Sequence, residues 1–321
     1  MPVSPLVAVV GATAAGKTGL SLDLAEALNG EIVNTDSMQL YRGMDIGTAK
    51  LPVEERRGIP HHLLDVVDIS QRVTVAEYQQ WARQVIRDIR DRGATPILVG
   101  GSALYTRAMI DRFEFPGTDD GLREQLEAEL EEKGTAELFA RLQELDPISA
   151  TRIEPDNGRR IVRALEVIEL TGKPFSARLP VQEYADPNTI QIGVDIDRET
   201  LDERIGLRVE EMFAPQKGGP EGQAHQGFVD EVHQLISMGL RGSAHEKPRT
   251  ASTAIGYREV GAYLDGLLTL EDAKERTKQA TRRFARRQDA WFRKDSRVVW
   301  VRYDDPARVE IAVAAIRRLG L

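Results

Sequence analysis

Eight residues near the start of the chain have the composition and spacing of a phosphate-binding loop. Gly11-Ala12-Thr13-Ala14-Ala15-Gly16-Lys17-Thr18 matches the pattern G-x-x-x-x-G-K-[ST] in full. Its glycines allow backbone N–H groups to converge on phosphate oxygens, its lysine adds a positive charge, and its threonine hydroxyl can bind Mg²⁺. The motif predicts a nucleotide or diphosphate site at residues 11–18, with Thr18 as the metal ligand.

A carboxylate follows the second apolar segment of the chain. Asp36 could act as a general base on an amine or hydroxyl, hold Mg²⁺ through water, or cap a helix. Asp65 and Asp68 are alternative metal-binding carboxylates, although both also suit surface turns. The pair His61-His62 makes a weak metal site because adjacent residues do not share a face. Asp36 is therefore the main candidate for proton transfer.

These motifs require strands and helices that position them at one place. Strands are predicted at residues 6–10, 31–35, 96–99 and 189–195, and helices at 17–28, 75–92 and 104–110. Strands that are almost continuously apolar and alternate with helices predict a parallel sheet covered on both faces. The expected fold class is α/β, a P-loop NTPase-like sheet flanked by helices. Ligands of such sheets bind beyond the carboxyl ends of the strands, where the phosphate loop, Asp36 and Gly100-Gly101 all fall.

The middle of the chain has a sequence pattern that is typical of helices. Residues 122–133, 135–145 and 157–171 predict helices joined by polar segments. The expected domains are a catalytic core of residues 1–116 and 189–321, with basic helices near its end, and an inserted helical subdomain of residues 117–188. Residues 213–227 contain four glycines and two prolines and predict a surface loop. The run Gly43–Lys50, rich in glycine and hydroxyl groups, predicts a binding loop.

Composition excludes several classes of protein. The 321 residues include no cysteine, so a disulfide framework, a zinc ribbon and a thiol nucleophile are excluded. No apolar run approaches the roughly 18 residues that span a bilayer, and Met1–Pro5 lack the basic segment of a signal peptide. The expectation is a soluble cytoplasmic protein.

The negative net charge of −8 conceals one strongly basic segment. Residues 276–294 carry eight basic side chains and a single acid, Asp289. A lone charge run of this kind is compatible with a solvated helix face or with binding to phosphates.

The phosphate loop and four further motifs together resemble the tRNA dimethylallyltransferases, the bacterial tRNA isopentenyltransferases. The matching segments follow the family's order at residues 11–18, 36–50, 100–105, 254–258 and 286–293. The resemblance implies transfer of a dimethylallyl group from dimethylallyl diphosphate to N6 of the adenosine 3′-adjacent to the anticodon, in tRNAs that read codons beginning with U. It also implies Mg²⁺ as cofactor, the tRNA anticodon stem-loop as partner, and a monomer that does not bind membranes.

The resemblance implies roles for individual residues. Asp36 would be the general base, Thr18 would lie beside Mg²⁺, and Lys17 and Arg208 would bind the diphosphate. The implied diphosphate site comprises Gly11, Ala12, Thr13, Ala14, Ala15, Gly16, Lys17 and Thr18. The implied tRNA-binding residues are Asp36, Ser37, Met38, Gln39, Ser102, Arg123, Arg159, Arg160, Ile161, Val162, Arg163, Thr253, Ala254, Ile255, Gly256, Tyr257, Arg258, Arg286, Arg287, Gln288, Asp289, Ala290, Trp291, Phe292 and Arg293.

The chain departs from the family at a few positions. Ala12 and Ala15 stand where the family usually has Pro and Ser, and Ser102 stands where it usually has Thr. Glu259 replaces a common Gln, which puts an acid next to an expected tRNA contact.

Three other functions remain possible from the residues alone. A P-loop kinase that binds ATP and phosphorylates a nucleoside or small metabolite explains the phosphate loop and Asp36, but not the basic helix. A transferase that prenylates free adenine nucleotides also leaves the basic helix unexplained. A non-catalytic RNA-binding protein conflicts with an intact Lys17, Thr18 and Asp36.

Overall fold

The structure is a computed structural model that describes residues 4–112, 115–178, 182–214, 227–241 and 250–319. It divides into a core unit, residues 1–110 and 184–321, and a helical unit, residues 111–183. The inserted segment was predicted at residues 117–188. The helical unit of the structure, 111–183, begins six residues before that range and ends five residues before its end.

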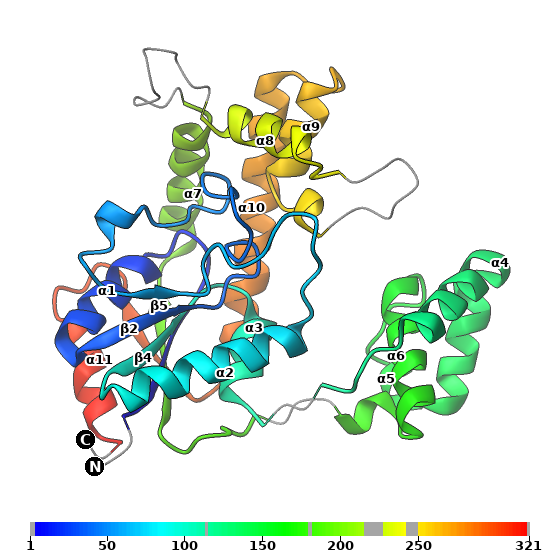
Figure 1. The fold of residues 1–321 in the computed structure, drawn as a ribbon, viewed down its shortest axis with the longest axis horizontal. Helices are drawn as coiled ribbons and strands as arrows, with labels where there is room; N and C mark the ends of the chain where they lie inside the picture. Colours follow the sequence, from blue (N-terminus) through cyan, green and yellow to red (C-terminus); the bar gives the residue numbers. More distant parts are fainter. Residues whose placement is uncertain (1–3, 113–114, 179–181, 215–226, 242–249, 320–321) are drawn as a thin grey trace. The chain divides into compact units, whose positions relative to one another are not determined.

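The core unit contains a parallel sheet, which confirms the predicted fold class (Figure 1). In the described residues it has six strands in the order β3-β2-β4-β1-β5-β6, and every neighbouring pair is parallel. Val7 of β1 lies opposite Ile97 of β4 and Ile190 of β5, which fixes the register at the centre of the sheet. The strands are β1 (Leu6–Val10), β2 (Gly30–Asn34), β3 (His61–His62), β4 (Thr95–Val99), β5 (Thr189–Asp195) and β6 (Val298–Arg302).

Helices cover both faces of the sheet because successive strand residues point to opposite sides. Leu6, Ala8 and Val10 pack in one apolar layer with residues of α2 and α3. Val7 and Val9 pack in the other layer with residues of α1 and α11. The helices of the core unit are α1 (Lys17–Leu28), α2 (Val75–Asp91), α3 (Ala103–Ile110), α7 (Arg198–Phe213), α8 (Phe228–Ser237), α9 (Tyr257–Leu264), α10 (Leu270–Phe292) and α11 (Arg308–Arg317), with 3₁₀ turns η1 (Val53–Glu55) and η4 (Ala251–Thr253).

Local sequence explains where the long helices begin. Thr74 caps α2 and Thr269 caps α10, and in each case the acid three residues later returns a bond to the capping residue. Gly227, the last residue of the predicted surface loop, precedes α8, whereas residues 215–226 of that loop lie outside the described residues.

The helical unit has its own apolar core. It contains α4 (Asp120–Leu145), α5 (Pro147–Ala150), α6 (Gly158–Thr171) and the turn η2 (Phe175–Arg178). Leu126, Leu142 and Leu165 are among the buried residues that hold α4 against α6. Gly134, at φ +80°, interrupts α4 where the sequence predicted two separate helices.

No helix in the described parts of the chain is both long enough and apolar enough to cross a membrane.

Candidate active site

The phosphate loop connects β1 to α1, and the first turn of α1 offers backbone N–H groups to an anion. Gly11, Ala14 and Gly16 have positive φ values of 137°, 62° and 102°, which turn the backbone around the start of the helix. Gly16 is the N-cap of α1, and no side chain caps this end. The free N–H groups of the first turn and the helix dipole therefore favour a phosphate here.

The two unusual alanines of this loop face the protein interior. Ala12 and Ala15 are 2% and 0% exposed and belong to the apolar layer beneath α1. The departures from the family's Pro and Ser therefore lie away from the ligand side, whereas Thr13 and Ala14 line a cavity.

Lys17 points back along the loop. Its Nζ donates a hydrogen bond of 2.6 Å to the carbonyl oxygen of Ala12. Burial is the main cause that lowers the pKa of Lys17 to about 8; the negative charge of Asp36 opposes this shift, and the positive charge of Arg208 adds to it. The ammonium group is thus close to losing its proton above neutral pH, and a bound diphosphate would favour the charged form.

Asp36 is held in place by its own turn. Its backbone N–H donates to Asn34 Oδ1 at 2.8 Å, and its Oδ1 accepts from the N–H of Met38 at 2.9 Å. The residues after Asp36 form a turn, so the alternative of a helix N-cap is wrong. Burial raises the pKa of Asp36, while the hydrogen bond from Met38 and the charges of Lys17 and Arg208 lower it. A partly buried carboxylate of this kind can accept a proton.

Arg208 of α7 supplies a second cation beside the phosphate loop. Its Nη1 donates to Thr13 Oγ1 at 3.5 Å. Burial lowers the pKa of Arg208, and the carboxylate of Asp36 raises it. Lys17, Arg208 and Asp36, which the sequence assigned to one site from three distant segments, therefore interact electrostatically.

The loop after β4 lies beside Asp36. Ser102 Oγ accepts from the N–H of Ser37 at 3.3 Å and lies 3.4 Å from Ser37 Oγ. A Cβ atom on Gly100 would lie 2.3 Å from Thr35 Oγ1, so only glycine allows β2 and β4 to approach this closely.

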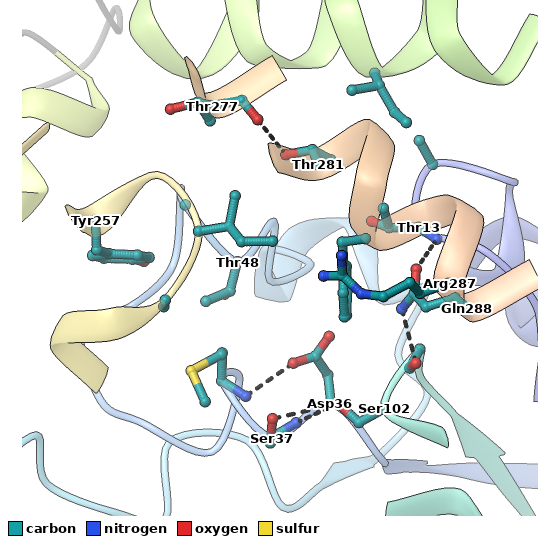
Figure 2. A pocket seen from close by; sticks show the side chains of 18 of the residues that line it. Thr13, Asp36, Ser37, Thr48, Ser102, Tyr257, Thr277, Thr281, Arg287 and Gln288 are labelled. Carbon is teal, nitrogen blue, oxygen red and sulfur yellow. Dashed lines mark hydrogen bonds between the residues drawn. The ribbon is translucent and has the colours of Figure 1, made fainter. Parts of the chain in front are cut away.

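Gln288 of α10 connects this loop to the phosphate loop. Its Nε2 donates to the carbonyl of Gly101 at 2.8 Å, and its Oε1 accepts from the N–H of Thr13 at 2.8 Å (Figure 2). A Cβ atom on Gly101 would lie only 2.1 Å from Gln288 Nε2. Gln288 is 4% exposed and its side chain binds the protein backbone on both sides, so its contact with tRNA stays a prediction.

All these segments surround one cavity of about 560 Å³ in the core unit. A cavity of this size is typical of small-molecule sites. Figure 2 shows Asp36 between Thr13 on one side and Tyr257 on the other. The predicted site residues that line it are Thr13, Ala14, Asp36, Ser37, Met38, Ser102, Arg208, Thr253, Ala254, Ile255, Tyr257, Arg287, Gln288 and Trp291.

Several residues predicted to bind tRNA have side chains that are occupied within the protein. Gln39 donates to the carbonyl of Thr48 at 3.0 Å, and Phe292 is fully buried. Ile161 and Val162 are buried in the core of the helical unit. The side chains of Ile161, Val162 and Phe292 pack inside the protein in this structure, and their predicted part in tRNA binding stays a prediction.

The acid at position 259 has a structural role. Glu259 Oε2 accepts from the N–H of Gly256 at 2.8 Å, and its Oε1 accepts from Arg258 at 2.7 Å. It caps α9 and is 4% exposed, so it presents no free charge to a nucleic acid.

Arg286 of α10 and Arg293, the C-cap of this helix, are exposed but form ion pairs. Arg286 lies 3.2 Å from Asp202, and Arg293 forms ion pairs with Asp195 and Asp289. Exposed pairs of this kind contribute at most about 1 kcal/mol, so they can exchange for phosphate contacts. Ala290 is exposed on the same helix, and Arg287 reaches the cavity.

In the helical unit, two of the predicted arginines share one buried carboxylate. Arg123 and Arg163 donate to Glu166 Oε2 at 2.7 and 2.8 Å, and Glu166 is fully buried. Arg159 and Arg160 are exposed at the start of α6.

Among the described residues, we consider the predicted donors for a metal ion at the phosphate loop in turn. Thr18 is exposed at the start of α1. Asp65 pairs with Lys50 at 2.6 Å and Asp68 with Arg42 at 3.0 Å, so neither is directed to the phosphate loop. His62 binds Glu31 at 2.6 Å, in agreement with a structural pair. One hydroxyl fits Mg²⁺ when substrate phosphates supply further oxygens.

Much of the cavity lining was not predicted from the sequence. The missed residues are Leu104, Tyr105, Ile205, Val209, Met212, Phe228, Thr250, Thr277, Thr281 and Phe284. Thr277 and Thr281 gave one signal, since they are four residues apart on an otherwise charged helix, and each donates its hydroxyl to the carbonyl four residues earlier.

A family model and curated relatives match most of this chain. A family model described as IPP transferase matches residues 39–295. A tRNA dimethylallyltransferase of Nocardioides sp. is 64% identical over 313 residues, covering 98% of this chain and 96% of the relative. The corresponding protein of Streptomyces coelicolor is 53% identical over 315 residues, covering 98% and 96%.

Solved structures agree as well. The full-length tRNA isopentenylpyrophosphate transferase of Bacillus halodurans has a TM-score of 0.69 and 39% identity, covering 98% of this chain and 97% of that chain. A eukaryotic dimethylallyltransferase acting on tRNA has a TM-score of 0.79 and 27% identity, covering 98% and 78%. These proteins are transferases, so the kinase alternative is not supported. The chain belongs to the tRNA dimethylallyltransferase family.

Proposed function

We propose that the protein transfers a dimethylallyl group from dimethylallyl diphosphate to N6 of the adenosine 3′-adjacent to the anticodon, in tRNAs that read codons beginning with U. The observation that carries the proposal is the position of Asp36, which shares one cavity with Thr13 of the phosphate loop and with Arg208. A proton acceptor and the binding groups for an anionic leaving group thus lie together.

The reaction needs strong stabilisation of the leaving group because an aryl amine is a weak nucleophile. The lone pair of N6 forms the new bond to the allylic carbon as the carbon–oxygen bond breaks. The electron pair of that carbon–oxygen bond leaves with the diphosphate. Lys17, Arg208 and the N–H groups at the start of α1 would bind that developing charge. Asp36 would take the proton from N6, so that atoms and charge balance.

Mg²⁺ would be held by Thr18 together with oxygens of the diphosphate, and it would offset negative charge on the leaving group. The other roles belong to residues of the chain: the phosphate loop would bind and orient the diphosphate, and Asp36 would hold the proton from N6.

The adenine must leave its stack to reach the cavity, because a base within the anticodon loop cannot otherwise approach the phosphate loop. Ser37, Met38 and Ser102 surround Asp36 and would contact the flipped base. Arg286, Arg287 and Arg293 of α10, and the exposed Arg159 and Arg160, would contact phosphates of the anticodon stem-loop. We place this activity in the cytoplasm, with the tRNA substrate; the monomeric state stays a prediction.

The site of transfer can be tested with matched RNA substrates. Labelled dimethylallyl diphosphate is incubated with the protein and a tRNA whose nucleotide 3′ to the anticodon is either adenosine or guanosine. The proposal expects label only in the adenosine RNA. Equal labelling of both RNAs, or labelling of free adenosine monophosphate in place of tRNA, would contradict it.

A further inference from the structure

The loop at residues 43–50, which the sequence predicts to bind a ligand, is bound by Gln39 at Thr48 and, at residues 45–47, by a carboxylate from outside the cavity. Gly47 and Thr48 of this loop line the cavity. Glu231 of α8 accepts from three consecutive backbone N–H groups: its Oε2 from Asp45 at 3.0 Å and Ile46 at 2.6 Å, and its Oε1 from Gly47 at 3.2 Å. The loop is therefore fixed at the point where it meets the cavity.

The same carboxylate also holds a second wall of the cavity. Tyr257, at the start of α9, donates its hydroxyl to Glu231 Oε1 at 2.6 Å. One oxygen thus joins the peptide of Gly47 to the ring of Tyr257, and both line the cavity. Glu231 does not line the cavity itself, so any effect it has on a ligand acts through these residues.

The wall that Glu231 supports is tightly packed. A Cβ atom on Gly47 would lie 2.2 Å from the ring of Phe228 and 2.5 Å from the ring of Tyr257. The rings of Phe228 and Tyr257 meet edge to face, with centroids 4.9 Å apart. A shift of the loop away from Glu231 would therefore change the shape of the cavity directly.

A carboxylate is the side chain that this arrangement requires. Its two oxygens accept four hydrogen bonds here, and all four partners are donors. A glutamine has one oxygen and one NH₂ group, so it would direct a donor toward at least one of these N–H or O–H groups. Hydrogen bonds to a charged acceptor are also stronger than those to a neutral one.

The supported wall lies on the far side of Asp36 from the phosphate loop. Figure 2 shows Thr48 and Tyr257 on one side of Asp36 and Thr13 on the other. An allylic chain whose diphosphate is bound at the phosphate loop extends away from that loop. If that chain runs past Asp36, the wall of Gly47, Thr48, Phe228 and Tyr257 would limit its length.

We propose that Glu231 is a positioning residue that fixes this wall and thereby makes the enzyme selective for a short allylic chain. The inference rests on the proposed function. One extra or missing methylene changes discrimination by about 10–200-fold in a well-packed apolar pocket, so a displaced wall has a measurable effect on donor choice.

The test compares dimethylallyl diphosphate with geranyl diphosphate as donors to the same tRNA. The proteins are wild type, Glu231→Ala, Glu231→Gln and Tyr257→Phe, each shown to be folded by circular dichroism, with tRNA affinity measured in parallel. For Glu231→Ala and Glu231→Gln we expect kcat/KM for dimethylallyl diphosphate, divided by kcat/KM for geranyl diphosphate, to fall by at least about tenfold. KM for dimethylallyl diphosphate should rise, while tRNA affinity changes by less than about twofold.

Tyr257→Phe removes one of the four donors and keeps the ring, so it should shift the donor ratio in the same direction by a smaller factor. Folded Glu231 variants with a wild-type donor ratio would overturn the proposal. If neither Glu231 variant folds, Tyr257→Phe decides: a shifted ratio supports the proposal and an unchanged ratio overturns it. A folded wild-type protein that uses neither donor would overturn the proposed function and this inference together.

Discussion

The side chain of Gln288 binds the backbone N–H of Thr13, 275 residues away in the sequence, at 2.8 Å. With its second bond, to the carbonyl of Gly101, it connects α10 to both loops that border Asp36. The helix that carries the exposed arginines thus also braces the phosphate loop.

Replacing Gln288 by Ala should therefore affect stability and donor binding together. It leaves the N–H of Thr13 and the carbonyl of Gly101 without their partner, which costs about 1–3 kcal/mol of unfolding free energy for a buried group. KM for dimethylallyl diphosphate should rise as well. Urea denaturation and initial rates measure the two effects, with Gln279→Ala, on an exposed position of α10, as control. Equal stability of the two variants would contradict the bracing role.

Asp36→Asn should separate binding from chemistry. Asparagine keeps the Oδ1 atom that accepts from Met38, so the turn is preserved. It cannot take a proton from N6, and loss of a general base typically lowers the rate by about 10²–10⁴-fold. We expect single-turnover rates to fall in that range while tRNA affinity is retained. Turnover at the wild-type rate would exclude Asp36 as the base.

The pH dependence of kcat/KM for dimethylallyl diphosphate should be bell-shaped. Asp36 works as a base only when deprotonated, and burial raises its pKa, so activity rises with pH through that raised value. Lys17 binds the diphosphate only when protonated, and burial lowers its pKa to about 8, so activity falls as pH rises through about 8.

Lys17→Arg provides the check on the alkaline side of this profile. Arginine keeps its charge at all accessible pH values, so the variant should lose the decline near pH 8 even if its rate is lower. A decline that stays at the same pH in Lys17→Arg would assign it to another group.

The exposed arginines of α10 should govern the salt dependence of tRNA binding. Arg286→Gln with Arg293→Gln removes two phosphate contacts without placing like charges beside Asp202 and Asp195. Each lost contact should weaken binding and reduce the slope of log K against log salt by about one. The control is Arg317→Gln with Arg318→Gln, on the exposed end of the chain's last helix, which changes net charge equally. Identical salt slopes for both double variants would move the RNA surface elsewhere.

The strands and the phosphate loop could be predicted because their signals are local. The predicted strand at 189–195 is confirmed residue for residue as β5, and the helix at 17–28 as α1. The two-residue strand β3 is too short to show a pattern, and β6 was missed although Val298 and Val301 are buried in it. Edge strands of this kind depend on tertiary pairing more than on local composition.

The three charged residues of the candidate site could be predicted, but their surroundings could not. Motif spacing and the family resemblance identified Lys17, Asp36 and Arg208, which the structure brings to one site. The apolar lining comes from separate helices, and nothing in the sequence marks Phe228 as a cavity residue. Motif boundaries also included residues such as Ile161 and Val162, whose helical spacing directs them into a core.

The most direct test of the central claim is a nucleoside analysis by mass spectrometry. Unmodified tRNA with adenosine 3′ to an anticodon that reads a codon beginning with U is incubated with protein, Mg²⁺ and dimethylallyl diphosphate, and in a parallel reaction with ATP in place of the allylic donor. The account predicts a five-carbon gain on that adenosine with the allylic donor alone. No gain with folded protein, or phosphate transfer from ATP, would contradict it.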